Sequence, residues 1–290
     1  MDPIPLPTRP LPQPTRQEAP ARIIAMGDIH GDIQAMRTAF RLANLIDEDD
    51  AWIGGETVVV QTGDQLDRGD DERDILHTLD RIADEAHAAG GMVVTLNGNH
   101  EAMNVELDLR YVTDDGFLDF ADLAPPPDEQ DEELQGWVEE QRGRVAAFRP
   151  GGVYAQLLSR QNTVAVVGNT LFVHGGVLPA HTGWGLENIN EDVTTWMLGE
   201  GDEPSDIIDG DGPLWAREYS DSPTQEACDG LDAVFADLDV TRMVVGHTVQ
   251  DEPNVSCFDQ VWRVDVGMAA AYGGTPAVIE IVDDEVRVID

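Results

Sequence analysis

Lysine is absent from this chain of 290 residues, and all 17 of its basic residues are arginine. They are opposed by 57 acidic residues, which gives a formal net charge of −40 at pH 7. An electric field of this sign repels nucleic acid and anionic membranes, so it excludes binding that depends on contacts with a phosphate backbone. The acidity is typical both of adaptation to high salt and of a GC-rich genome, and the composition leaves both explanations open.

Long apolar runs are also missing. No segment approaches the ~18 uninterrupted apolar residues that indicate a transmembrane helix, so we expect no membrane insertion. Residues 1–20 carry seven prolines and no apolar segment typical of a signal peptide. We expect them to form a disordered, proline-rich arm, and the protein to be soluble and cytoplasmic. A leader removed from the chain would instead place it in the periplasm or outside the cell.

Only two cysteines are present, Cys228 and Cys257, so a dense disulfide framework is excluded. We expect two free buried thiols in preference to one bridge. Cys257 has Arg263 at the Cys-x5-Arg spacing of a cysteine-dependent phosphatase. The intervening residues 258–262 contain no glycine that would let backbone N–H groups surround a phosphate, and Asp259 among them repels anions. We interpret this spacing as a coincidence.

Five short apolar runs each end in glycine and a side chain that can bind a metal ion. A buried β-strand followed by a glycine-rich turn places such side chains at the carboxyl end of the strand, where open α/β sheets bind ligands. Four of the seven histidines lie at these junctions. Repetition of one strand-then-ligand pattern predicts a single convergent site. The junctions occupy residues 23–32, 58–69, 93–101, 171–176 and 243–248.

The order of the elements up to residue 101 predicts successive βαβ units. Strands alternate with two helices, over 32–45 and 72–89, whose apolar residues recur at helical spacing. Asp32 is the expected N-cap of the first helix. Residues 114–150 break this rhythm with an acidic, proline-containing loop and a helix over 134–148. We interpret that segment as an insertion that forms one wall of the site.

After residue 160 the chain becomes strand-rich and more antiparallel. We therefore predict one α/β domain over 21–290, in which two mixed β-sheets pack face to face and helices cover the outer faces. The last two strands should form a hairpin that turns at Asp283 and Asp284. The expected later strands cover 163–167, 170–174, 242–246, 261–266, 276–282 and 285–289.

The junctions carry oxygen and nitrogen ligands but no cysteine. Asp28 and His30 are alternate residues that leave a strand, so both side chains can point toward one face. Asp64 can bridge two metal ions that lie ~3.5–4 Å apart, the spacing used in two-metal phosphoester chemistry. Six mixed ligands suit two borderline divalent ions and do not suit a structural zinc site. The other ligands we expect are Asn99, His174 and His247.

Neighbouring residues match the other needs of a phosphate reaction. His100 follows a ligand directly, so it can face the leaving group, and Asp67 could hold its imidazole as a charged proton donor. Arg68 offers a planar fork for two phosphate oxygens. Glu101 is expected to support the local turn by hydrogen bonding. Three other histidines are interpreted as bystanders, two solvated on a helix and one in a loop: His77, His87 and His181.

These motifs resemble those of the calcineurin-like metallophosphoesterases, and within them the phosphoprotein phosphatase superfamily. In that superfamily the chain is similar to the Shewanella-like phosphatases, a bacterial-type branch. The resemblance spans roughly residues 22–289. The segments that carry it are 27–31, 63–69, 98–101, 174–176, 212–217, 242–248 and 262–274.

The resemblance implies a four-layer sandwich and two divalent metal ions per chain, either Mn, Fe or Zn. It assigns the first metal to Asp28, His30 and Asp64, and the second to Asp64, Asn99, His174 and His247. It also implies that His100 is the general acid, paired with Asp67, and that Arg68 binds phosphate. Arg217 stands at the branch's Leu-Trp-x-Arg position and is the candidate for a second phosphate-binding arginine.

The chain departs from the wider metallophosphoesterase pattern in two places. Thr248 and Val249 follow His247, so a second histidine that many phosphodiesterases of this fold use is missing, which favours monoester hydrolysis. The Ser-Ala-Pro-Asn-Tyr loop of the Ser/Thr phosphatases is also absent from residues 265–274. Substrate preference therefore does not carry over from those enzymes.

We predict a dinuclear-metal-dependent phosphomonoester hydrolase, a phosphoprotein phosphatase that uses direct attack of a metal-bound hydroxide. Phosphotyrosine is mildly preferred over phosphoserine and phosphothreonine. One alternative is a hydrolase of dinucleoside polyphosphates or other small phosphate esters, and another is a catalytically silent phosphate-binding module. The expected partner is a phosphorylated protein or a small phosphate ester, not nucleic acid, and the sequence sets no oligomeric state.

Overall fold

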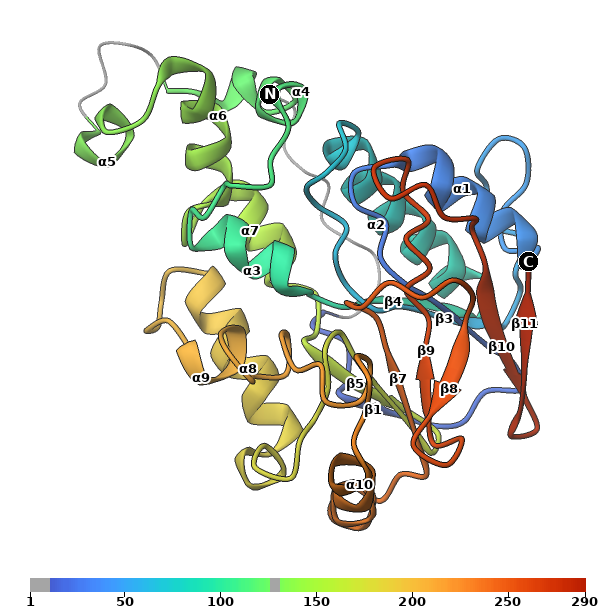
Figure 1. Cartoon of the computed structure of the whole chain (residues 1–290). Coiled ribbons are helices and arrows are strands. Elements are labelled where there is room, and N and C mark those ends of the chain that lie inside the picture. The colour runs from blue at the N-terminus through green and yellow to red at the C-terminus, as the bar shows by residue number, and fades with distance from the viewer. Residues whose placement is uncertain (1–10, 126–130) are drawn as a thin grey trace.

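The computed structural model describes residues 11–125 and 131–290 (Figure 1). One of its two sheets is built mainly by the first part of the chain. Three strands run parallel in this sheet, and the C-terminal hairpin adds two antiparallel strands, so the order is β11-β10-β2-β3-β4. The strands are β2 (Ile23–Met26), β3 (Val58–Gln61), β4 (Met92–Thr95), β10 (Val278–Val282) and β11 (Glu285–Ile289).

The second sheet has six strands in the order β1-β5-β6-β7-β9-β8. Here β6, β7 and β9 run parallel, whereas β5 and β8 are antiparallel to their neighbours β6 and β9. The second half is thus less antiparallel than the sequence led us to expect. The strands are β1 (Arg16–Gln17), β5 (Val164–Val167), β6 (Thr170–Val173), β7 (Arg242–Val245), β8 (Asn254–Ser256) and β9 (Val261–Arg263).

Side-chain alternation along the strands builds four layers. In β2, Ile23 and Ala25 pack between the two sheets, while Ile24 and Met26 face the helices α1 (Ile33–Leu42) and α2 (Glu72–Ala88). The outer face of the six-stranded sheet is covered by a second set of helices (Figure 1). The predicted fold class is confirmed. The main covering helices are α3 (Asn99–Val105), α7 (Val153–Leu158), α8 (Leu186–Met197) and α10 (Gln225–Leu238), with the short α9 (Ser205–Ile208) and the 3-10 turn η2 (Thr182–Trp184) beside them.

Local sequence signals explain several element ends. The Asp32 carboxylate accepts hydrogen bonds from the backbone N–H groups of Gln34 and Ala35, so it is the predicted N-cap of α1. The terminal hairpin turns at Asp283 and Asp284, which both have positive φ angles, as a tight two-residue hairpin turn requires. Both predictions are confirmed.

The segment 114–150 is helical, but its long helix is broken. The expected helix over 134–148 is replaced by α5 (Glu132–Gln135) and α6 (Glu139–Phe148). Before them lie α4 (Asp114–Leu118) and the 3-10 turn η1 (Ala121–Leu123). Figure 1 shows α4, α5 and α6 standing away from the sheets, above α3 and α7. Residues 126–130 of the expected acidic loop lie outside the described residues.

Two expectations need correction. Arg16 and Gln17 form β1 and pair with β5, so two residues of the expected N-terminal arm belong to a sheet; residues 1–10 lie outside the described residues. Cys228 and Cys257 form a disulfide and are not free thiols. They are 29 residues apart in sequence, and only the packing of α10 near the end of β8 brings them together. Among the described residues no helix has the length and apolar character needed to cross a membrane.

Candidate functional site

The predicted ligands converge because parallel strands of both sheets end at one place. Asp28 follows β2 and Asp64 follows β3, in one sheet, while His174 and His247 follow β6 and β7 in the other. The two sheets meet at this edge: the backbone N–H of His247 lies 3.2 Å from both carboxylate oxygens of Asp28. Asn99 arrives from the first turn of α3, directly after β4.

One group of ligand atoms surrounds Nε2 of His174. This nitrogen lies 2.9 Å from Oδ1 of Asn99, 3.1 Å from Nδ1 of His247 and 3.3 Å from Oδ2 of Asp64. The other ring nitrogen, Nδ1, lies 2.9 Å from the carbonyl oxygen of Thr62. Because a carbonyl can only accept, Nδ1 carries a hydrogen, and in the neutral ring Nε2 then presents a lone pair to its neighbours.

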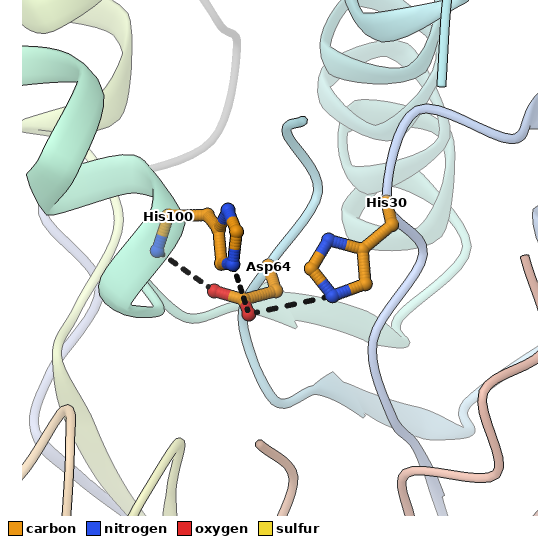
Figure 2. Close-up of side chains that lie close together, drawn as sticks. All are labelled: His30, Asp64 and His100. Carbon is orange, nitrogen blue, oxygen red and sulfur yellow. Dashed lines mark hydrogen bonds and ion pairs between the residues drawn. The ribbon is translucent and has the colours of Figure 1, made fainter. Parts of the chain in front are cut away.

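A second group of side chains approaches the same oxygen of Asp64. Nε2 of His30 is 3.6 Å from Oδ2 of Asp64 and 3.8 Å from Oδ2 of Asp28. Its Nδ1 lies 3.0 Å from the carbonyl oxygen of Leu66, so the same reasoning leaves a lone pair on Nε2. Figure 2 shows the Asp64 carboxylate between the rings of His30 and His100, with Nε2 of His100 3.8 Å away. All of these residues are buried.

The donor set matches a divalent cation. With the His174 ring neutral, as a metal ligand must be, its lone pair faces an amide oxygen and a carboxylate oxygen, and none of these three atoms has a hydrogen to share. The arrangement is repulsive without a cation between them. Asp64 belongs to both groups, Asp64–His174–His247 and His30–Asp64–His100, in which the ligand atoms lie within 4.8 Å of one another. The buried His and Asp groups therefore fit divalent metal ions.

The pKa values of the candidate ligands also indicate a site that accepts a cation. Burial lowers the pKa of His30 to about 4, although Asp64 opposes the shift. Burial and the neighbouring His174 lower the pKa of His247 to about 2, so this ring stays neutral, as a metal ligand must. Burial, with the charges of Asp265 and Asp64, raises the pKa of Asp28 well above its usual value. A bound cation would relieve this repulsion among carboxylates.

The backbone at the site is in an unusual conformation. Five of the predicted site residues have positive φ angles between 45° and 69°, a region that non-glycine residues seldom adopt. A Cβ at Gly98 would overlap the carboxylate of Asp64, so only glycine fits there. Backbone strain of this kind is concentrated at functional sites. The five residues are His30, Asp64, Asp67, Arg68 and His247.

His100 makes a buried pair with Asp67. Nδ1 of the imidazole lies 2.6 Å from Oδ2 of the carboxylate, which holds the ring in one orientation. Burial alone would lower the pKa of His100, but the charge of Asp64 and the hydrogen bond to Asp67 outweigh it and raise that pKa to about 9. The imidazole is therefore protonated at neutral pH in this environment.

Glu101 supports the turn, as the sequence predicts. Its two oxygens accept four backbone hydrogen bonds, from the N–H groups of Asp64, Gln65, Leu66 and Gly98. These contacts fix the backbone that carries the central carboxylate of the site. Burial and the charge of Asp64 raise the pKa of Glu101 to about 7.

The two arginines reach the same cavity of about 100 Å³. The Arg68 guanidinium lies 4.1 Å from the centre of the Tyr111 ring, and its buried Nε has no hydrogen-bond partner within residues 11–125 and 131–290. Arg217 is exposed and donates to the carbonyl of His247 and the hydroxyl of Thr248. Both cations therefore border the ligand groups, where an anionic group would meet them.

The sequence did not single out four residues that line this cavity. Tyr111, Trp215 and Tyr272 form aromatic walls, and the buried Asp265 lies beside Asp28. Trp215 could have been found from its place two residues before Arg217. Tyr111 follows α3 in an irregular segment that has no motif.

The remaining histidines lie outside the cavity. His87 is exposed, and His77 is exposed but stacks on Tyr154 and hydrogen-bonds its hydroxyl at 3.0 Å. His181 is in a loop as expected, yet it is buried, and it accepts a hydrogen bond from the backbone of Leu178.

A model of the calcineurin-like phosphoesterase family matches residues 21–251 of the chain. The chain belongs to this family. This phosphoesterase is 41% identical to Shewanella-like protein phosphatase 2 of Arabidopsis thaliana over 95% of its own length and 79% of the relative's. It is 28% identical to Shewanella-like protein phosphatase 1 of Plasmodium berghei, over 92% of its own length and 74% of the relative's.

The structure agrees with this placement. A solved cold-active protein tyrosine phosphatase superposes on the phosphoesterase with a TM-score of 0.77 and 25% identity, covering 95% of this chain and 78% of the other. The predicted branch, the Shewanella-like protein phosphatases, is confirmed. The protein is a metallophosphatase of the protein phosphatase type, with buried His and Asp groups that imply divalent metal ions.

Proposed function

We propose that this phosphatase hydrolyses phosphate monoesters on proteins with two divalent metal ions, of Mn, Fe or Zn. The observation that carries the proposal is the central position of Asp64, whose carboxylate takes part in both groups of ligand atoms. Asp28, His30 and Asp64 would hold the first ion. The second would be held by Asp64 together with Asn99, His174 and His247. When bound, the ions supply Lewis-acid activation of water and of the phosphoryl group.

The side chains around these ligands supply binding and proton transfer. The buried Nε of Arg68 has no partner among the described residues, and Arg217 borders the cavity from the loop between α9 and α10, so both can contact phosphoryl oxygens. His100 holds a proton on the ring and lies next to the shared carboxylate, so it can donate to the leaving oxygen. Asp67 keeps the ring oriented and stabilises its positive charge.

The cavity walls favour an aromatic phosphate ester. Tyr111 and Tyr272 flank Arg68, with ring centres 4.1 and 5.8 Å from its guanidinium, and Trp215 lies on the same cavity. A phenyl ring attached to the phosphate could stack between such walls, which contributes about 0.5–1.5 kcal/mol beyond buried area. A relative of known structure is a protein tyrosine phosphatase. We propose a mild preference for phosphotyrosine over phosphoserine and phosphothreonine.

A panel of phosphopeptides tests both the substrate preference and the effect of the net charge. The net charge of −40 opposes anionic peptides at long range, but screening within about 10 Å at 0.1 M salt leaves the local cations in control near the site. Three peptides of one sequence, with phosphotyrosine, phosphoserine or phosphothreonine, should be assayed with Mn at low and high salt. We expect turnover of all three, the phosphotyrosine peptide ahead, and rates that persist or rise with salt.

A pair of variants tests whether the aromatic wall causes the preference for phosphotyrosine. Tyr272→Ala should narrow the ratio between phosphotyrosine and phosphoserine turnover, whereas Arg81→Ala, which removes an exposed arginine paired with Glu85, should leave it unchanged. Diadenosine tetraphosphate belongs in the same panel. Failure on every phosphopeptide beside good turnover of the dinucleotide would retire the protein substrate. Metal binding without any hydrolysis would identify a silent binding module instead.

A further inference from the structure

Arg144 is a fully buried arginine in the insertion. It lies in α6, its exposed fraction is 0%, and it is the largest of the fully buried side chains among the described residues. An arginine is almost never buried unless its charge is paired. Its neighbour Arg142, two residues earlier in the same helix, donates to the backbone carbonyls of Leu134 and Trp137.

All five N–H donors of the Arg144 guanidinium have a partner. The two terminal nitrogens donate hydrogen bonds to the two carboxylate oxygens of Glu72, which is also fully buried. The remaining donors reach Oδ1 of Asn104 at 2.8 Å, the carbonyl of Gly116 at 3.1 Å and Oδ1 of Asp67 at 3.2 Å. A fork that is fully used in this way fixes the relative positions of its partners.

The partners of Arg144 also hold Asp67 through several hydrogen bonds. Its Oδ1 accepts from Arg144 and from Nδ2 of Asn104, at 3.2 and 3.0 Å, and its backbone N–H donates to Glu72 at 2.5 Å. The other oxygen, Oδ2, is left for Nδ1 of His100 at 2.6 Å. Asn104 also donates to the backbone carbonyl of His100 at 2.9 Å, so the network holds both ends of the pair.

The insertion is packed closely enough to hold Arg144 in place. A Cβ at Gly143 would overlap the carbonyl of Phe120, so α6 lies directly against η1. The guanidinium also lies 5.2 and 5.0 Å from the ring centres of Phe120 and Phe148. These contacts provide little room for another position of the side chain.

We propose that Arg144 is a positioning residue through which the insertion aligns the His100–Asp67 pair for proton donation to the leaving group. The inference rests on the proposed role of His100 in the reaction. We expected the segment 114–150 to form one wall of the site, but none of its described residues lines the cavity. Its contact with the site runs instead through this buried arginine. Arg144 itself does not line the substrate cavity.

A loss of alignment should depend on the leaving group. Phenyl phosphate and phosphotyrosine release an oxygen with a pKa of about 10, which needs a proton in the transition state. p-Nitrophenyl phosphate releases a more stable anion and needs the proton less. A misplaced acid therefore slows phenyl phosphate more than p-nitrophenyl phosphate, while a general loss of structure slows both alike.

The test compares three variants of the full chain. Arg144→Lys keeps the charge but replaces the fork by a single point of attachment. Because a buried unpaired carboxylate could prevent folding, the double variant Arg144→Met with Glu72→Gln removes both charges together. Arg142→Lys is the control on the same helix, and near-UV circular dichroism checks the folding of each.

With Mn present, both Arg144 variants should lose ~10–100-fold in kcat on phenyl phosphate, the effect of a displacement of about 1 Å in a catalytic group. On p-nitrophenyl phosphate the loss should stay below about threefold, with KM nearly unchanged, and Arg142→Lys should match the wild type. Equal losses on the two substrates, or no loss on either, would overturn the proposal.

A measurement without turnover separates this proposal from the proposed function. In metal-free protein labelled with ¹⁵N, the Nδ1–H of His100 should give a downfield proton signal, assigned by its disappearance in His100→Asn. We expect this signal to shift or broaden in both Arg144 variants and to remain in Arg142→Lys. An unchanged signal refutes the positioning role whatever the activity, whereas a wild type without phosphatase activity refutes the proposed function alone.

Discussion

Replacing His100 by asparagine tests the acid of the proposed reaction. The imidazole is 6% exposed, its Nδ1 is 2.6 Å from Asp67, and its pKa is raised to about 9. Asparagine keeps a polar group beside Asp67 but delivers no proton. Loss of a general acid costs ~10²–10⁴-fold in kcat, or about 3–5 kcal/mol in the transition state. The loss should approach the upper end for a phosphotyrosine peptide and the lower end for p-nitrophenyl phosphate.

The same role of His100 predicts the direction in which kcat changes with pH. His100 donates only in its protonated form, which predominates below its pKa, so kcat should fall as pH rises through that value. The value of about 9 belongs to a ring that feels the full charge of Asp64. Metal ions bound at Asp64 cancel this charge, so in the loaded enzyme the decline should be centred below 9. The decline should be absent from His100→Asn.

The assay is kcat against pH for wild type and His100→Asn, together with metal content measured by plasma mass spectrometry. The backbone N–H of His100 donates to Asp64 at 3.0 Å, a contact that the substitution retains, so metal content should not change. A variant stripped of metal would show that His100 is a ligand and not the acid. Equal activity at every pH would also refute the reasoning.

Four further predictions follow from the structure. Asp64→Asn should reduce bound metal to about one ion per chain or fewer, because both ligand groups share this carboxylate; full occupancy by mass spectrometry would contradict it. Arg68→Ala should raise KM and the inhibition constant of inorganic phosphate by ~10-fold, and an unchanged constant would remove Arg68 from the phosphate site. Cys257→Ser should lower the free energy of unfolding by about 2–4 kcal/mol in denaturant titrations and leave kcat unchanged, since the disulfide to Cys228 closes a loop of 29 residues and lies outside the cavity; lost activity in folded protein would revive a role for the thiol. Initial rates on a phosphotyrosine peptide should not fall between 0.1 and about 1 M NaCl, because screening relieves repulsion by the chain; a steep fall would show that attraction by the site governs encounter.

Much of the site could be predicted from sequence because its ligands are tied to strand ends. A ligand such as Asp64 or His174 directly follows an apolar run, and parallel strands bring their carboxyl ends to one edge. The order of these runs therefore predicted both the fold class and the convergence. The supporting role of Glu101 could likewise be predicted from its position next to Asn99 and His100 in the sequence.

Other features depend on pairs of residues that no local pattern connects. Cys228 lies in α10 and Cys257 at the end of β8, and nothing in either segment indicates that they approach each other. The strand at Arg16 and Gln17 follows a proline-rich stretch and forms only because β5 has a free edge. The high proline content predicted an extended arm there, but pairing with β5 makes these two residues a strand.

The sequence by itself determined the layers and the strand-end junctions, and it predicted the candidate ligands, because each depends on residues within about ten positions of one another. The tertiary structure alone decided the surroundings of those ligands. Arg144 lies 77 residues from Asp67 in the chain, and its sequence context resembles that of a surface helix. Only packing removes its guanidinium from water, and a buried charge must then find the carboxylates that neutralise it.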